Sequence, residues 1–538
     1  MPTLSWIGKE AVEKHHLEIP YRLLEYDDSL SAGDKESDNL LIQGDNLHAL
    51  KALLPYYAGK VKCIYIDPPY NTGNENWSYN DNVNAPEIKK WINEIVGREN
   101  EDLTRHDKWL CMMYPRLQLL RKLLSINGAI FISIDDGEQA HLRLLMDEIF
   151  GSQNFITNII WQKKFSPQND AKYLSDNHDF IVCYAKSKKN WARNLLPRTE
   201  KMDSRYKNPD NDLRGPWTSS DLTAKRITEK DIYPVKSPSG KIFMPTKGRS
   251  WTVSQSKMNE LISDNRIWFG TKGSNMPRRK KFLYEVQSGF VPLTIWLHSE
   301  VGHNQQARQD LKNIFPNENT PFETPKPKSL IKRILQLATD NNSIVMDSFA
   351  GSGTTGEAVL ELNKEDGGYR KFILVELENR IAIDVTAKRL ERVINGYNLE
   401  RSNGLAKQRD GLGGGFRYGK LKESLFDQYG NVSEGVTFKQ LAYHIFFSET
   451  GIPLKQNSKL GTPLIGKYKG AAYYLLFNGI LGDKSVNGGN VLTSKVLESL
   501  PQHNGNKIVF GMASRLSAAR LKKENIVFKQ IPVEIKTS

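Results

Sequence analysis

The sequence has little of what secreted, membrane-spanning and zinc-bound proteins depend on. Its 538 residues include three cysteines, at positions 63, 111 and 183, whose wide separation predicts neither a disulfide framework nor a zinc site. The longest apolar runs, such as residues 128–134 and 471–477, are too short to span a bilayer, and no apolar signal segment opens the chain. We therefore expect a cytoplasmic protein with no membrane partner and no metal site.

Core-forming residues, in contrast, are plentiful. Hydrophobic residues make up 39% of the chain and aromatic residues 10%, which excludes a disordered or low-complexity protein. At roughly 100–200 residues per domain, we expect two to four domains. Lysine and arginine outnumber aspartate and glutamate by 75 to 61, which gives a net charge of +14. This surplus favours a polyanionic partner, although a solvated surface has the same composition.

The positive charge is concentrated in one part of the chain. Between Arg193 and Lys281 there are 20 Lys and Arg residues but only 9 Asp and Glu, a net charge of +11. Aromatic residues are interleaved with these cations, and the stretch ends in the basic cluster 278–281. One interpretation is a nucleic-acid-binding insert whose cations neutralise phosphates. The other is a basic surface domain with a small aromatic core, and composition favours neither.

On both sides of the basic stretch, short buried strands alternate with helices. This alternation predicts an α/β fold with a mostly parallel sheet and helices on both faces. Residues 1–38 are predicted to be a helical lead-in, and the Gly-rich residues 411–419 a flexible junction or turn before a smaller α+β tail. Strands are expected at 39–43, 61–66, 129–134, 154–161, 180–184, 343–347 and 371–376, and helices at 46–54, 109–124, 140–150, 329–338, 354–362 and 380–394.

A glycine-rich turn follows the predicted strand that ends at Asp347. Gly351, Gly353 and Gly356 fit the spacing G-x-G-x-x-G between a strand and a helix, where backbone approaches a ligand closely and helix N–H groups point at it. Glu376 ends the next strand, where a carboxylate can accept hydrogen bonds from both ribose hydroxyls. The pattern fits NAD, FAD or S-adenosylmethionine (AdoMet). A P-loop is disfavoured because glutamate follows the last glycine where a P-loop has lysine.

A second motif, Asp67-Pro68-Pro69-Tyr70, follows the predicted strand 61–66. Ligands bind beyond the carboxyl ends of parallel strands, so this tetrapeptide is expected to face a site. The two prolines stiffen the loop. Asp67 and the Pro68 carbonyl can accept the two hydrogens of a planar exocyclic amine, and Tyr70 can stack on its ring. A Pro-rich turn with a buried aromatic residue is the alternative for these residues taken alone.

Taken together, the two motifs resemble those of DNA methyltransferases that modify amino groups. Residues 67–70 resemble their catalytic motif and residues 347–355 their AdoMet-binding F-x-G-x-G motif, in the order of the permuted β class. Asp rather than Ser before Pro-Pro-Tyr resembles the adenine-N6 branch. Residues 39–81 and 513–535 look most like modification (Mod) subunits of type III restriction–modification systems. Ser348 departs from the proline of many members, which affects loop stiffness more than ligand contacts.

The resemblance implies a set of site residues. Asp67, Pro68, Pro69 and Tyr70 would be catalytic. Asp45 would lie by the adenine of AdoMet, and Lys326, in a Lys-Pro motif, by its methionine end. The full set implied to bind AdoMet is Asp45, Lys326, Asp347, Phe349, Gly351, Gly353, Thr354, Thr355 and Glu376.

The resemblance also implies a Rossmann-like, AdoMet-dependent methyltransferase fold with a mixed, mostly parallel seven-stranded sheet. An inserted target-recognition domain and a small α+β C-terminal domain would complete the chain. The expected divisions are a lead-in (1–38), a catalytic half (39–190), the target-recognition insert (191–320), an AdoMet-binding half (321–395) and a C-terminal domain for dimer or partner contacts (396–538).

The implied activity is site-specific transfer of a methyl group from AdoMet to N6 of an adenine in duplex DNA. The base must flip out of the helix to be reached, and Asp67, Pro68 and Tyr70 would then hold it for in-line transfer. Expected partners are double-stranded DNA, a second copy of the chain and a helicase–endonuclease (Res) subunit, in the cytoplasm of a bacterium or archaeon, at the nucleoid. An orphan or cytosine-N4 enzyme of the same fold is an alternative. A Rossmann-type oxidoreductase would explain the glycine turn but not residues 67–70.

Overall fold

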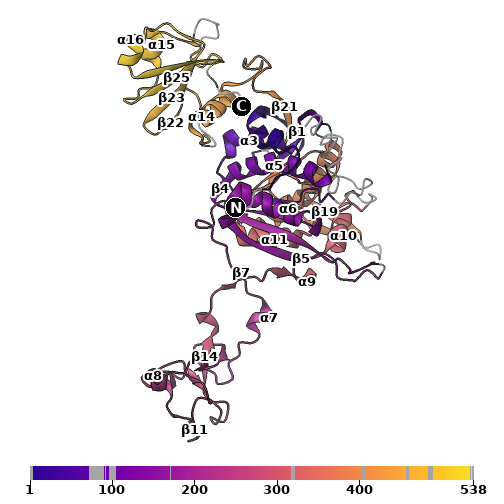
Figure 1. The fold of residues 1–538 in the computed structure, drawn as a ribbon, viewed down its shortest axis with the longest axis vertical. Helices are drawn as coiled ribbons and strands as arrows, with labels where there is room; N and C mark the ends of the chain where they lie inside the picture. Colours follow the sequence, from indigo (N-terminus) through magenta and orange to yellow (C-terminus); the bar gives the residue numbers. More distant parts are fainter. Residues whose placement is uncertain are drawn as a thin grey trace. The chain divides into compact units, whose positions relative to one another are not determined.

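The computed structural model describes residues 4–535 apart from 35, 72–89, 91–92, 96–103, 170, 317–320, 401–405, 456–459, 483–488 and 534. It divides into two compact units (Figure 1). The larger contains Met1–Asn194 and Leu293–Ser538, and the smaller contains Leu195–Pro292. The last ten residues of the first segment that resembles Mod subunits, 72–81, lie outside the described residues.

A mixed sheet forms the centre of the larger unit. Its six neighbouring strands from β21 to β4 run parallel, whereas β6 is antiparallel to both of its neighbours. The predicted mixed, mostly parallel sheet is therefore confirmed. It has ten strands rather than seven, because β1 and β21 extend one edge and β16 the other. The order is β1 (Arg22–Gly33), β21 (Gly415–Ser424), β2 (Leu40–Gln43), β18 (Lys371–Glu376), β17 (Ile344–Asp347), β3 (Val61–Ile66), β4 (Leu124–Ile134), β6 (His178–Ala185), β5 (Phe155–Gln162) and β16 (Ile295–Trp296).

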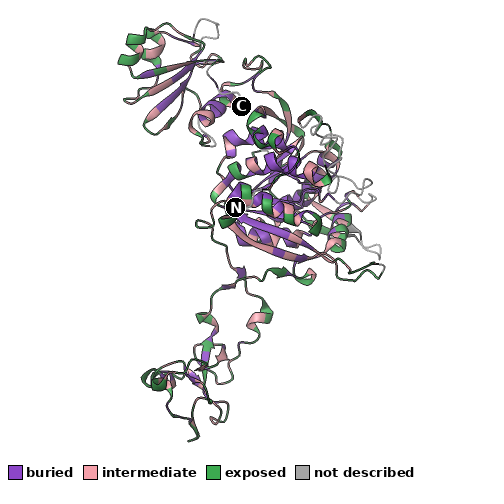
Figure 2. Ribbon diagram, viewed as in Figure 1, coloured by how far each residue is buried: buried purple, intermediate pink, exposed green. Residues whose placement is uncertain are grey.

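Helices cover both faces of this sheet. Ile64 and Ile66 of β3 pack in one hydrophobic cluster with α3 (Asn46–Tyr57), α5 (Arg105–Leu123) and α6 (Asp136–Met146). The alternate residues of β3 point to the opposite face, because successive strand side chains alternate. There α11 (Lys328–Ala338), α12 (Thr354–Asp366) and α13 (Lys388–Asn395) contact one another in sequence. Buried residues accordingly run through the sheet and the inner sides of its helices (Figure 2).

Two local predictions are wrong. The helical lead-in is helical only at α1 (Lys9–Glu13) and α2 (His15–Glu18), since Arg22–Gly33 forms strand β1. The Gly-rich stretch is a turn only at its start, because Gly415 onward forms β21, which pairs with β1 and with β2. Each of these polar or Gly-rich segments is held as a strand by its partner, and a partner distant in the sequence leaves no local signal.

The smaller unit has its own hydrophobic core. A three-stranded sheet of β13 (Ile267–Trp268), β14 (Arg278–Phe282) and β8 (Trp217–Ser220) accompanies helix α8 (Gln255–Ser263). Most of its aromatic residues are buried, among them Tyr233, Trp251 and Phe269. The aromatic residues of the basic stretch therefore build a core. The unit is also shorter than the predicted insert 191–320, because Ile295–Trp296 joins the large sheet beside β5.

The C-terminal residues form the expected α+β arrangement. Helix α14 (Phe438–Thr450) packs near α3, and a four-stranded sheet follows. Its strands are β22 (Leu464–Tyr468), β23 (Ala471–Leu475), β25 (Lys507–Gly511) and β27 (Ile526–Gln530). Among the described helices of the chain, none is both long and apolar enough to cross a membrane.

Candidate active site

The sheet brings the two predicted motifs together. Strand β3 ends directly before Asp67, and its parallel neighbour β17 ends in Asp347. On the other side of β17, β18 ends in Glu376. The carboxyl ends of parallel strands lie at one edge of a sheet, where ligands bind in open α/β folds. Three acidic residues far apart in the sequence therefore face the same edge.

The Asp67–Tyr70 loop is anchored from behind. The indole N–H of Trp109, in α5, donates a hydrogen bond to the Pro69 carbonyl at 2.7 Å. Asn71 then adopts a left-handed backbone conformation, with φ at 59°, and its amide donates to Glu138 Oε1 at 2.5 Å. The Asp67 carboxyl is itself buried, with 6% of the residue exposed. These contacts fix the backbone on which the Asp67 and Tyr70 side chains are mounted.

Two histidines lie beside Glu138, the residue that accepts the hydrogen bond from Asn71. Glu138 is almost fully buried, and its carboxylate lies 2.6 Å from Nδ1 of His106 and 3.1 Å from Nδ1 of His141. The side chains of Glu138, His106 and His141 lie close enough together to hold a metal ion. A second group with this property is Asp136, Asp176 and His178. Neither cluster contains a predicted catalytic residue, and Glu138 already accepts hydrogen bonds from Asn71 and His106.

The glycine turn is shaped by conformations that favour glycine. Gly351 and Gly353 have φ angles of 49° and 78°, in the left-handed region. A Cβ atom at Gly351 would lie 2.9 Å from Cζ of Phe322, so a larger residue would also clash. Helix α12 starts at Thr354, and no side chain caps its N-terminus. Its first N–H groups therefore point toward the turn, as an anionic or polar ligand requires.

The Asp347 side chain stabilises this turn by hydrogen bonds. Its carboxyl accepts hydrogen bonds from the Phe349 N–H at 3.0 Å and from the Thr355 hydroxyl at 2.6 Å. Burial, and to a lesser degree the nearby charge of Asp67, raises the pKa of Asp347 to about 7, although these hydrogen bonds and the charge of Lys326 oppose the rise. The predicted residues Asp347, Phe349 and Thr355 therefore form one hydrogen-bonded unit.

Glu376 and Asp45 contact backbone N–H groups. The fully buried carboxylate of Glu376 accepts hydrogen bonds from Gly351 N at 2.8 Å and from Glu378 N at 3.0 Å. Asp45 caps helix α3 by accepting from Leu47 N at 2.8 Å, and it pairs with Arg116. Both residues thus shape the turns at the ends of their strands. Their predicted contacts with the ribose and adenine of AdoMet stay predictions.

Lys326, predicted to bind the cofactor, also contacts the predicted catalytic motif. Its ammonium group is 2.5 Å from Asp67 Oδ2 and 5.0 Å from the centre of the Tyr70 ring. Only about a tenth of the Lys326 side chain is exposed. It therefore contacts both functional side chains of the predicted catalytic motif.

Sequence reasoning missed Asp179, which pairs with Lys163. Asp179 is buried at the start of β6, and Lys163 Nζ lies 2.7 Å from its carboxylate. Burial raises the pKa of Asp179 to about 6, while Lys163 and Lys326 lower it. Burial and then the charges of Asp67 and Asp179 raise the pKa of Tyr70. Because β6 is antiparallel, the start of this strand reaches the edge where the parallel strands end, which no local pattern indicates.

The two motifs line a common cleft with the loop that carries Lys326. The open space in it is about 20 Å³, close to that of one water molecule, and Phe322 and Lys326 are among its walls. The lining residues include Asp67, Asp347, Phe349, Gly351, Thr354 and Thr355. Seven of the thirteen predicted site residues thus meet here. The other six lie outside the lining: Asp45, Pro68, Pro69, Tyr70, Gly353 and Glu376.

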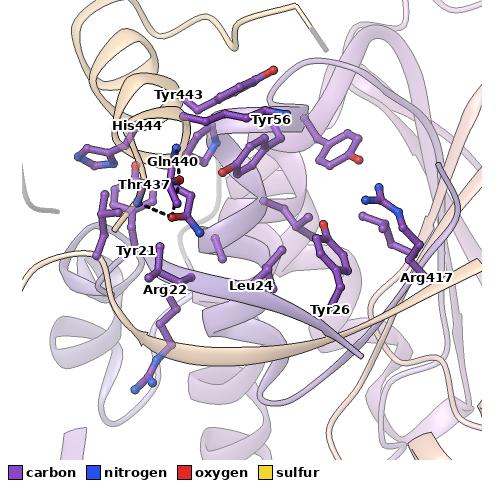
Figure 3. Close-up of a pocket in the computed structure, with 18 of the residues that line it drawn as sticks. Tyr21, Arg22, Leu24, Tyr26, Tyr56, Arg417, Thr437, Gln440, Tyr443 and His444 are labelled. Atoms are coloured by element: carbon purple, nitrogen blue, oxygen red, sulfur yellow. Dashed lines mark hydrogen bonds between the residues drawn. The ribbon is translucent and has the colours of Figure 1, made fainter. Parts of the chain in front are cut away.

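A larger cavity of about 390 Å³ lies elsewhere, among β1, α3, β21 and α14 (Figure 3). Tyr26, Tyr56 and Tyr443 line it together with Arg417. Tyr56 and Tyr443 stack with their ring centres 4.7 Å apart. None of the predicted site residues lines this cavity, so size alone does not identify the active site.

Comparison with known proteins finds DNA methylases and Mod subunits. The DNA methylase family of the N6/N4 type matches residues 61–387. The Mod subunit of the type III restriction–modification enzyme StyLTI from Salmonella typhimurium is 35% identical over 73% of this chain and 60% of its own length. The EcoPI Mod subunit from Escherichia phage P1 is 32% identical over 74% of this chain and 69% of its own length. The chain thus spans about 60% of the StyLTI subunit.

Among solved structures, the cytosine-N4-specific PvuII DNA methyltransferase is 13% identical, with a TM-score of 0.34 over 66% of this chain and 86% of that one.

Proposed function

Because the chain belongs to the N6/N4 DNA methylase family and is similar to type III Mod subunits, we propose that it transfers a methyl group from AdoMet to N6 of an adenine in duplex DNA. The observation that carries this proposal is the shared cleft, in which Asp67 lies beside the glycine turn and Asp347, while Lys326 contacts both Asp67 and Tyr70. Family membership also removes the oxidoreductase alternative.

The residues around the turn fit AdoMet. Gly351 and Gly353 leave room that a Cβ would fill, and the uncapped start of α12 offers N–H donors. Asp347, Phe349, Thr354 and Thr355 would hold the cofactor there, with Lys326 at its carboxylate. AdoMet supplies an electrophilic methyl group on a sulfonium when bound. The loop with Phe322 and Lys326 must move for it to enter, because the open space is about 20 Å³.

The chain's own residues account for activation of the base. An amino nitrogen conjugated with its ring is a poor nucleophile. Asp67 and the Pro68 carbonyl would accept its two hydrogens, which favours a pyramidal nitrogen with its lone pair directed at the methyl group. The Asp67 charge also stabilises the positive charge that develops on nitrogen. Positioning of this kind can lower a barrier by ~7–11 kcal/mol.

Tyr70 would hold the flipped base by stacking. Aromatic stacking is worth ~1–3 kcal/mol per base, which offsets much of the few kcal/mol that flipping costs. Trp109 and Asn71 keep the loop rigid, so that Asp67 and Tyr70 stay in register with each other. The aspartate before Pro-Pro-Tyr supports adenine over cytosine as the target.

The test is methylation-aware sequencing of DNA from cells that express the chain, compared with cells that express Asp67→Ala. We expect N6-methyladenine at one short sequence with the natural chain and none with the variant, which should still bind DNA and AdoMet. Methylation at cytosine N4 would replace the adenine assignment, and labelling of RNA or protein but not DNA would overturn the proposal.

We also propose that the smaller unit reads the target sequence and that a Res subunit and a second Mod copy associate with the chain through its C-terminal part. The relatives are Mod subunits of type III enzymes, which supports the Res partner. Of the basic cluster, Lys280 is buried against Asp210 and Asp212, whereas Arg278, Arg279 and Lys281 are exposed. Only the exposed cations can contact DNA. Exchange of Leu195–Pro292 for the equivalent unit of a relative should change the methylated sequence.

A further inference from the structure

The ammonium group of Lys326 makes the two contacts that the proposed reaction assigns to the target base. It pairs with Asp67 Oδ2 at 2.5 Å, where an adenine amino group would donate a hydrogen bond. It also lies 5.0 Å from the centre of the Tyr70 ring, within cation–π range, on the residue proposed to stack the base. Lys326 and a flipped adenine therefore compete for the same carboxylate and the same aromatic ring.

The surroundings of Lys326 favour this position while the cleft holds nothing else. Its charge lowers the pKa of both Asp179 and Asp347, so it lies within electrostatic reach of three carboxylates including Asp67. Almost no water reaches the pair, since the two side chains are 10% and 8% exposed. An ion pair with so little solvent is costly to break without a replacement partner for the cation.

The carboxylate of AdoMet bound in the same cleft would be such a replacement partner. Among the described residues that line it, Lys326 is the only one with a positive charge, whereas Asp67 and Asp347 are acidic. The carboxylate of AdoMet needs a cation when it is buried there. Lys326 can meet this need, since its backbone lies in the cleft wall formed by Phe322, Thr324 and Pro325, and a lysine side chain has four rotatable bonds.

We propose that Lys326 is a positioning residue that blocks the base-binding site until the cofactor is bound. In the absence of cofactor it neutralises Asp67 and covers Tyr70. When AdoMet is bound, Lys326 turns to the cofactor carboxylate and leaves Asp67 and Tyr70 open to the adenine. Base capture is then coupled to the presence of a cofactor, which prevents the enzyme from holding a flipped adenine that it cannot methylate. This inference rests on the proposed function.

The experiment measures base flipping rather than methyl transfer. A duplex with the methylation site, identified beforehand by sequencing, carries 2-aminopurine at the target adenine, and its fluorescence rises when the base leaves the stack. S-adenosylhomocysteine, which has the carboxylate but no methyl group, should raise the flipped fraction in the natural protein at least about fivefold, the lower end of typical coupling between sites. Decarboxylated AdoMet should leave it near the cofactor-free value.

Variants separate this role from a structural one. Lys326→Gln should flip the base without any cofactor, and S-adenosylhomocysteine should add little. In Lys326→Arg, which keeps the charge, flipping should again depend on S-adenosylhomocysteine. Lys332→Gln, which changes a lysine of α11 paired with Glu361 and Glu365, should behave like the natural protein. If Lys326→Gln fails to fold, the comparison of the two cofactor analogues on the natural protein still decides the question.

Three results would overturn the inference: cofactor-independent flipping in the natural protein, equal flipping by the natural protein with decarboxylated AdoMet and with S-adenosylhomocysteine, or equal dependence on S-adenosylhomocysteine in Lys326→Gln. Failure of the proposed function is distinguishable from these, since the natural protein would then methylate no DNA at all.

Discussion

Replacement of Asp347 by asparagine should change how stability depends on pH. The Asp347 carboxyl is buried beneath the glycine turn and accepts hydrogen bonds from the Phe349 N–H and the Thr355 hydroxyl. Asparagine has the same shape. Its oxygen can accept from Phe349 N, and the Thr355 hydroxyl can rotate to accept from the new amide. The substitution therefore removes a titratable group without opening a cavity.

The magnitude follows from the pKa of Asp347, which burial raises to about 7. In an unfolded chain the same carboxyl ionises near pH ~4. Between these values the folded state binds a proton that the unfolded state has lost, so stability falls as pH rises through this window. At ~1.4 kcal/mol per pKa unit, the penalty is absent below pH ~4, reaches ~1.4 kcal/mol at pH ~5 and levels off at ~4 kcal/mol above pH ~7.

Urea unfolding of the natural protein and of Asp347→Asn at pH 5 and pH 8 tests this reasoning. The free energy of unfolding of the variant minus that of the natural protein should be ~2–3 kcal/mol larger at pH 8 than at pH 5, because only the natural protein loses stability as the pH rises. Asp179 also titrates in this range, but it is present in both proteins and cancels. A difference in the free energy of unfolding that is the same at both pH values would reflect the hydrogen bonding of the new amide. Equal pH dependence in both would refute the raised pKa and with it the account of the buried turn.

Three further changes test the anchors of the site and of the smaller unit. Trp109→Phe removes the donor to the Pro69 carbonyl, so stability should fall by ~1–3 kcal/mol and single-turnover methyl transfer should slow while AdoMet affinity stays unchanged. Gly351→Ala forces a left-handed conformation and places Cβ 2.9 Å from Phe322, so AdoMet binding by calorimetry should weaken and stability should fall by ~1–3 kcal/mol. Lys280→Met removes the ammonium group from Asp210 and leaves Asp212 paired with Arg214 alone, so the Leu195–Pro292 unit should lose ~1–3 kcal/mol and become sensitive to limited proteolysis.

Matched controls make these outcomes specific. Arg279 is exposed on the same strand as Lys280, and Arg279→Ser should leave stability within about 0.5 kcal/mol while weakening DNA binding. If Lys280→Met and Arg279→Ser were equally stable, the internal role of Lys280 would be wrong. If Trp109→Phe lowered AdoMet affinity as much as transfer, Trp109 would not act through the catalytic loop alone.

Much of the catalytic sheet follows from local sequence patterns. Local patterns predicted, within a few residues, the strand that ends directly before Asp67, the strands that end in Asp347 and Glu376, and the helices between them. Apolar periodicity and turn residues act over a few positions, so such elements can be recognised locally. The edge strand β1 and its neighbour β21 were not predicted, since these polar and Gly-rich sequences become strands only when β21 pairs with β1 on one side and with β2 on the other. Asp179 was not predicted as a site residue either, because it reaches the site only through the antiparallel pairing of β6 with strands distant in the sequence.

The sequence by itself determined which chemical groups the protein has. It specified a stiff Asp-Pro-Pro-Tyr loop and a glycine turn, each directly after a strand, and a concentration of positive charge between them. Only the tertiary structure decided how these groups are used. It buries Lys280 and the aromatic residues of the basic stretch in a core, and it pairs Lys326 with Asp67 across 259 positions of sequence. Such pairs arise from sheet order and helix packing, and no pattern within a few residues of either partner can indicate them.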